Sequence, residues 1–288
     1  MATLRTKRHA GARILPLYAV GGTRRFAAPA ISHRQDRHRI DCVCCGMAHL
    51  LKGGAMSIRL VVKGIPGMAA VYRFVRGCCL RNKSPEDVFT DIFQKNLWKG
   101  NESVSGPGSS LDSAAALIEA LPIMWRDLGI RTVLDIPCGD FHWMSCVDMS
   151  GIDYLGADIV ADLIKQNARH ERHNIRFRKI NLLSDALPKV DFVLCRDLFG
   201  HLCFKDIFAA LSNICASGST YLLVSTSNTA HNFDIVTGLG RGGSVNLEVA
   251  PFFFPRPITT IDEKYRGARG AYRTVMGLWK VIDIARCC

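Results

Sequence analysis

The sequence lacks the features that identify several common classes of protein. It contains no uncharged apolar run of roughly eighteen residues, the length that a membrane-spanning helix needs. The nearest approach, residues 58–75, includes Arg59, Lys63, Pro66 and Arg73, although a basic amphipathic helix on a membrane surface stays open there. The chain also has no phosphate-binding lysine loop, no G-x-S-x-G turn and no H-E-x-x-H helix. These absences argue against nucleotide hydrolases of the P-loop type, α/β-hydrolases and zinc proteases.

The twelve cysteines do not show the two C-x-x-C pairs of a typical zinc site. Free cysteine packs as a small apolar side chain, and five cysteines fall within apolar, regularly spaced segments: Cys138, Cys146, Cys195, Cys203 and Cys215. We therefore expect free thiols in a reducing cytoplasm and no metal site. The alternative is a structural zinc ion held by the C-x-C-C cluster: Cys42, Cys44 and Cys45.

Acidic residues are scarce in the first part of the chain. Residues 1–84 contain 16 lysines and arginines but only Asp36 and Asp41 as acids, whereas the remainder holds 21 basic and 23 acidic residues. The net charge of +12 therefore belongs to the N-terminal segment. A nearly balanced C-terminal part argues against a nucleic-acid groove in that part.

This change of character suggests three segments. Residues 1–55 form a basic extension, for which three interpretations stay open: a disordered arm, an arginine-rich transit peptide, or an over-extended reading frame with the true start at Met56. Residues 56–83 form a basic and apolar lead-in, through which the chain could contact a membrane peripherally. Residues 84–288 form the globular domain, beginning with the helix start Ser84-Pro85-Glu86-Asp87.

One short stretch organises this domain. Val133, Leu134 and Ile136 form an apolar run that Pro137 and Gly139 end, which predicts a buried strand leading into a tight turn. Asp135 lies near the end of this strand and Asp140 just after the glycine. In open α/β sheets, ligands bind beyond the carboxyl ends of the strands, where a glycine lets the backbone approach them closely.

The run Leu134–Trp143, LDIPCGDFHW, resembles the first motif of class I S-adenosylmethionine-dependent methyltransferases, in a bacterial branch with D-x-P-C-G-D-F-x-W-M at this point. Only the middle glycine of the usual G-x-G-x-G remains, as Gly139. The stretch 96–110 is similar to the same branch. The resemblance covers roughly residues 85–283 and implies a Rossmann-like α/β fold: a seven-stranded, mostly parallel sheet, helices on both faces, and a C-terminal antiparallel hairpin from 258–261 and 275–282.

The resemblance implies S-adenosylmethionine as cofactor and a set of residues around it. Asp158, 23 residues after Asp135, would accept hydrogen bonds from the ribose hydroxyls, as an acid at this place also does in NAD-binding proteins. Asn181 stands where the family often has an acid that binds the adenine amino group. The full expected set is Asp135, Pro137, Cys138, Gly139, Asp140, Asp158, Ile159, Asn181, Leu182 and Arg196.

The acceptor site is expected near the segment after the fourth strand, Arg196-Asp197-Leu198-Phe199-Gly200-His201. Asp197 would face the reacting methyl group, and His201 is either a general base or a residue that packs or caps the next helix. The long stretch 226–257 is interpreted as an acceptor lid, with a structural flap as the alternative. Arg241, Asn246 and Trp143 would contact a small polar, sugar or glycan acceptor.

Periodicity predicts further elements. Helices are expected at 111–128, with Pro122 kinking or breaking it, at 141–149, at 159–173 and at 206–216. The stretch 96–110 is either a loop that closes over the cofactor or an ordinary connection.

Two other functional classes stay open. Loss of two motif glycines and of the acid at position 181 would suit a methyltransferase fold that binds S-adenosylmethionine without turnover. A nicotinamide-dependent oxidoreductase would share Asp158 but lacks the third glycine of its fingerprint.

Overall fold

The computed structural model describes residues 80, 83–238, 245–264 and 273–286. Within this part of the chain, no helix combines the length and the apolar character that crossing a membrane requires. Several predicted features lie outside the described residues: the extension 1–55, nearly all of the lead-in 56–83, Arg241, and the cluster of Cys42, Cys44 and Cys45.

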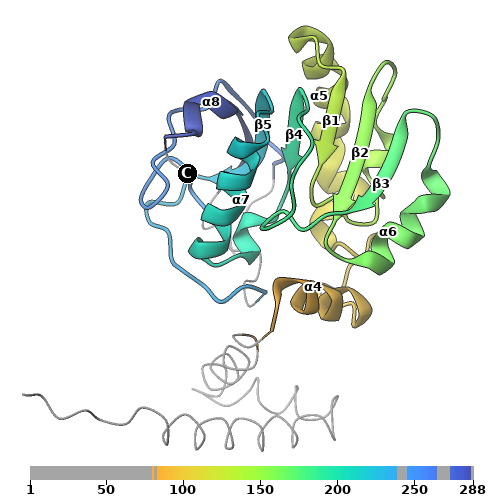
Figure 1. The fold of residues 1–288 in the computed structure, drawn as a ribbon, viewed down its shortest axis with the longest axis horizontal. Coiled ribbons are helices and arrows are strands. Elements are labelled where there is room, and N and C mark those ends of the chain that lie inside the picture. Colours follow the sequence, from red (N-terminus) through yellow and green to blue (C-terminus); the bar gives the residue numbers. More distant parts are fainter. Residues whose placement is uncertain (1–79, 81–82, 239–244, 265–272, 287–288) are drawn as a thin grey trace, which may run out of the picture. The chain divides into compact units, whose positions relative to one another are not determined.

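Seven strands form one sheet (Figure 1). In chain order they are β1 Thr132–Asp135, β2 Asp153–Asp158, β3 Ile175–Lys179, β4 Phe192–Cys195, β5 Tyr221–Ser227, β6 Thr259–Ile261 and β7 Thr274–Lys280. Their order across the sheet is β3-β2-β1-β4-β5-β7-β6. The first five strands pair in parallel, while β7 is antiparallel to both β5 and β6. The predicted Rossmann-like sheet with its C-terminal hairpin is confirmed.

The central strands β1 and β4 are covered on both faces. All four residues of β4 and the last three of β1 are buried, so neither strand alternates between polar and apolar residues. The edge strand β3 does alternate, with Ile175 and Phe177 buried and Arg176 and Arg178 exposed. The parallel register places Asp135 opposite Gly156, so the carboxyl ends of β1 and β2 lie at the same edge.

The helix α4, Pro85–Gln94, starts as predicted, since the Ser84 side chain accepts a hydrogen bond from the amide of Asp87. The helix α5, Leu111–Leu128, runs through Pro122 as one element, so the alternative of a break at this proline is wrong. Leu117, Leu121 and Trp125 are fully buried on both sides of the proline, and this packing outweighs one missing backbone hydrogen bond.

The crossover helices differ from the prediction. The segment 141–149 contains only a single 3-10 turn, η2, Met144–Cys146, because Phe141 takes a left-handed backbone (φ 58°) and its ring is buried with Trp143. Within it Cys146 is exposed, unlike the packed cysteine that we expected. After β2, the α6 helix covers only Ala161–Asn167 and a 3-10 turn, η3, follows at Ala168–His170.

Two hydrophobic cores cover the two faces of the sheet. One joins the sheet to α4, α6, α7 (Phe204–Ala216) and α8 (Val281–Ile284), and the other joins it to α5 and η2. In Figure 1, α6 and α7 lie in front of the sheet and α5 lies behind it. Gly218, at φ 66°, follows the end of α7 as predicted. With both faces filled, the carboxyl edge of the strands is left to hold a ligand.

Candidate functional site

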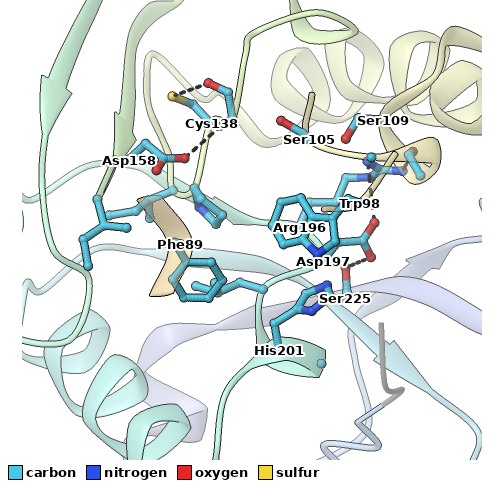
Figure 2. A pocket seen from close by; sticks show the side chains of 18 of the residues that line it. Phe89, Trp98, Ser105, Ser109, Cys138, Asp158, Arg196, Asp197, His201 and Ser225 are labelled. Atoms are coloured by element: carbon cyan, nitrogen blue, oxygen red, sulfur yellow. Dashed lines mark hydrogen bonds and ion pairs between the residues drawn. The ribbon is translucent and has the colours of Figure 1, made fainter. Parts of the chain in front are cut away.

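A cavity of about 440 Å³ lies at the carboxyl ends of β1, β2, β4 and β5. Figure 2 shows its side chains, with Cys138 and Asp158 at one end and Asp197, His201 and Ser225 at the other. The structure brings most of the residues predicted from the sequence to its wall: Asp135, Pro137, Cys138, Gly139, Asp140, Trp143, Asp158, Ile159, Asn181, Leu182, Arg196, Asp197 and His201.

Asp135 lies at the end of β1 and is almost completely buried. Burial raises the pKa of its carboxyl to about 7, although the Tyr154 hydroxyl, which donates a 2.6 Å hydrogen bond to Asp135 Oδ2, lowers it. The Asp158 carboxylate raises this pKa further. A positive charge placed in the cavity would favour the ionised form of Asp135.

Gly139 forms the turn after β1 with φ 55°. Its amide donates a 3.2 Å hydrogen bond to Asp158 Oδ2, and its carbonyl accepts one of 2.8 Å from Asn167 Nδ2. The other oxygen of Asp158 accepts from the Val160 amide at 2.9 Å. Burial raises the pKa of Asp158 to about 6, against these backbone hydrogen bonds. The turn and the second strand are thus held together by one buried carboxylate.

The loop of residues 96–110, here the covering loop, lines the cavity through Trp98 and the run from Val104 to Ser109. Asp140 fastens it. The Asp140 carboxylate accepts hydrogen bonds of 2.9 Å from both Ser103 Oγ and the Val104 amide, and a longer one from Ser105 Oγ. The Asp140 carboxylate therefore anchors the covering loop to the turn after β1.

The end of the cavity near β2 and β3 is mostly apolar, with Ile159, Leu163 and Leu182 in its wall. Asn181 adds one polar group there. Its Oδ1 already accepts a 3.0 Å hydrogen bond from the Leu183 amide, but an amide oxygen has two lone pairs. One acceptor position therefore remains for a ligand.

Arg196 follows β4, and its guanidinium is buried. Nε lies 2.7 Å from Glu263 Oε1 and Nη2 donates to the Gly108 carbonyl at 2.7 Å, while the Trp143 ring lies 5.3 Å below the guanidinium carbon. Burial raises the pKa of Glu263 to about 7, although Arg196 lowers it. The guanidinium thus ties β4 to the chain after β6 and to the covering loop.

Asp197 projects into the cavity with its side chain 48% exposed. Its backbone is left-handed (φ 54°), and the amide donates a 2.8 Å hydrogen bond to Ser225 Oγ of β5. His201 ends the 3-10 turn η4, Phe199–His201, just before α7. Its imidazole lies 5.1 Å from the Trp98 ring. The structure therefore brings Asp197 and His201 to the same end of the cavity.

Asn246 is placed differently from the prediction. Its Nδ2 donates to the Thr229 carbonyl at 2.7 Å and its Oδ1 accepts from the Glu248 amide at 2.9 Å. Asn246 is not among the described residues that line the cavity. It organises the loop after β5 from within, and Arg241, its expected companion, lies outside the described residues.

No protein-family model matches the chain, and no curated protein sequence matches it. Solved structures do match. The 1,6-didemethyltoxoflavin-N1-methyltransferase of Burkholderia thailandensis is 16% identical over 68% of this chain and 86% of its own, with a TM-score of 0.48. Magnesium protoporphyrin IX methyltransferase of Synechocystis is 13% identical over 68% and 97%, with a TM-score of 0.45. The methyltransferase domain of bacterial CtHen1 is 14% identical over 58% and 99%, with the same score. Similarity this low does not support an assignment of function.

Sequence reasoning missed several residues of this site. Glu263 comes two residues after β6, and the position of an acid at the end of a predicted strand was a usable signal. Nothing local in the sequence marks Ser225 as a partner of Asp197. Tyr154 contacts Asp135, and Asn167 contacts Gly139. Only the folded structure brings these pairs together, so no local pattern marks them.

Proposed function

We propose that this chain transfers a methyl group from S-adenosylmethionine to a small-molecule acceptor. The observation that carries the proposal is the joint position of Asp135, Gly139 and Asp158 around one cavity at the carboxyl edge of this sheet. The antiparallel β7 between β5 and β6 departs from the all-parallel 3-2-1-4-5-6 order of dinucleotide-binding sheets. It agrees with the hairpin that the resemblance implies.

The residues present fit the cofactor. A cavity of about 440 Å³ falls within the usual range for small-ligand sites. Each oxygen of Asp158 accepts one backbone hydrogen bond, and a carboxylate has about four lone-pair positions, so two hydroxyls of a ribose could still bind. The apolar end near Leu163 and Leu182 suits a purine ring.

When bound, S-adenosylmethionine supplies an electrophilic methyl group together with its own leaving group. The protein then has to orient the acceptor and exclude water. In this proposal the covering loop, fastened by Asp140, excludes water, while Asp197 orients the acceptor and receives its proton. The expectation of a sugar or glycan acceptor rested on Arg241, Asn246 and the balanced charge of the domain. Arg241 lies outside the described residues and Asn246 does not line the cavity, so we propose a small-molecule acceptor without specifying a sugar.

Calorimetric titration of the full chain tests the donor site. We expect micromolar binding of S-adenosylmethionine and S-adenosylhomocysteine and no binding of NAD. Binding of NAD alone would favour the oxidoreductase. Donor binding without transfer to any acceptor in a broad panel would favour the binding module without turnover.

A glycine substitution gives a second test. Gly139→Ala places a side chain in the left-handed region, which costs about 1–2 kcal/mol, and its Cβ would lie 2.3 Å from Ser105 Oγ. We expect S-adenosylmethionine affinity to fall by about tenfold as the covering loop is displaced. Gly151→Ala is the matched control, since it has φ 76° and meets only the flexible Arg131 side chain at 3.3 Å. Equal affinities of the two variants would contradict the prediction.

A further inference from the structure

The cavity has an excess of acidic side chains. Arg196 is the one lysine or arginine among the described residues of its wall. Five carboxyl groups line the same wall: Asp135, Asp140, Asp158, Asp197 and Glu263. A cavity lined mainly by one sign of charge attracts ligands of the opposite sign and repels those of the same sign.

Arg196 is committed to other groups and does not offset this excess for a ligand. Its donors bind Glu263 and the Gly108 carbonyl, and the Trp143 ring covers it. Its Nη1 lies 3.7 Å from Asp197 Oδ2. At this end of the cavity two carboxyl groups therefore face one guanidinium, and the more exposed of the two, Asp197, is the one open to an acceptor.

Aromatic rings line the wall beside Asp197. The Trp98 ring lies 5.1 Å from the His201 imidazole and 6.4 Å from the Phe89 ring, and all three line the cavity. Figure 2 shows Trp98, Asp197, His201 and Ser225 together at the end away from Asp158. A group of aromatic rings beside a carboxylate suits a flat, unsaturated ligand that donates a hydrogen bond.

Resting on the proposed function, we propose that the methyl acceptor is an aromatic compound with a hydroxyl or amine nucleophile and no anionic group. Its ring packs on Trp98 and His201, and its O–H or N–H donates to Asp197. The lone pair of this oxygen or nitrogen forms the bond to the methyl carbon while the carbon–sulfur bond breaks and its electron pair stays on sulfur. The proton that the acceptor releases passes to Asp197. Phosphorylated or carboxylated acceptors are disfavoured by the acidic wall.

Three phenols that share a ring and differ in charge test this proposal: tyramine is cationic, para-cresol is neutral and para-hydroxyphenylacetate is anionic. Each is titrated calorimetrically into the full chain saturated with S-adenosylhomocysteine, and glucosamine serves as a cation without an aromatic ring. We expect tyramine and para-cresol to bind. Para-hydroxyphenylacetate should bind at least about tenfold more weakly than either of them, and glucosamine should bind more weakly than tyramine.

Two variants test separately the two features that the proposal assigns to the acceptor, its lack of negative charge and its aromatic ring. Asp197→Asn should remove most of the difference between tyramine and para-hydroxyphenylacetate, whereas the exposed Asp127→Asn should leave it unchanged. Trp98→Leu should weaken all three phenols by about tenfold. Equal binding of the anionic phenol, an unchanged difference in Asp197→Asn, or no binding of any phenol while S-adenosylhomocysteine binds would each overturn the acceptor class and leave the proposed function standing. Failure of S-adenosylhomocysteine to bind would instead overturn the proposed function.

Discussion

Replacing Asp135 with asparagine is expected to abolish S-adenosylmethionine binding and to stabilise the free protein at about pH 8. The reason for the first effect is position, since Asp135 ends β1 inside the cavity beside Asp158. A neutral amide there no longer attracts a cationic ligand. We expect the affinity for S-adenosylmethionine to fall by more than about a hundredfold, measured by calorimetry.

The stability effect follows from the raised pKa. Burial raises the pKa of Asp135 from 3.8 to about 7, so between these values the folded protein binds more protons than the unfolded chain. The free energy of unfolding therefore falls as the pH rises through this window. Asparagine at position 135 does not titrate. Its side-chain amide, however, brings N–H groups into a buried place, and one of them lacks a hydrogen-bond acceptor, which reduces the gain in stability. We expect the advantage of the variant to grow from near zero at about pH 5 to about 2 kcal/mol at about pH 8.

Urea unfolding at the two pH values measures this change. Asp127→Asn, an exposed carboxylate beside Arg126, is the control and should show no pH-dependent gain. If the gain in the free energy of unfolding of Asp135→Asn does not grow with pH, then ionisation of the wild-type Asp135 carboxyl does not destabilise the folded protein. Unchanged S-adenosylmethionine affinity would remove Asp135 from the proposed donor site.

The strand ends were predictable because their signals are local. Val133, Leu134 and Ile136 form an apolar run that Pro137 and Gly139 end, and an acid at the end of the next strand, Asp158, faces the same edge once the strands pair in parallel. The resemblance then supplied the order of the later elements. Here local chemistry and the final structure agree.

The failures come from tertiary contacts. The turn after β1 does not become a helix, because Phe141 packs at 5.4 Å from the Tyr154 ring and at 5.0 Å from the Phe177 ring, and a longer helix would carry it away. Asn246 was expected to face a ligand, but the nearby chain takes both of its polar atoms. No periodicity in the sequence records such contacts between distant segments.

The partnership of Arg196 with Glu263 was also hidden, since 67 residues separate the two. Arg196→Met leaves Glu263, itself 7% exposed, without its cation and removes the donor to the Gly108 carbonyl. Breaking a buried ion pair by removing one partner typically destabilises a protein by about 3–5 kcal/mol. We expect a loss of this size at about pH 8 in urea unfolding.

The loss should be smaller at about pH 5. Burial already raises the pKa of Glu263 to about 7, and loss of Arg196, which lowers it, raises it further. A protonated Glu263 is then the stable folded form, so the stability of the variant falls as the pH rises through the raised pKa. Glu263→Gln serves as the comparison, because it keeps the shape of the side chain but removes the anion of the pair instead of the cation.

The double variant Arg196→Met/Glu263→Leu separates the effect of Arg196 on stability from its effect on the covering loop. Replacing a whole buried ion pair by apolar residues is often neutral, so the free energy of unfolding should largely recover. The Gly108 carbonyl still lacks its donor, and this anchor of the covering loop stays lost. Methyl transfer should therefore remain impaired in a protein that is again stable. A double variant as unstable as Arg196→Met would show that the uncompensated Glu263 is not the cause, whereas full recovery of transfer would show that the covering loop does not need its anchor to Arg196.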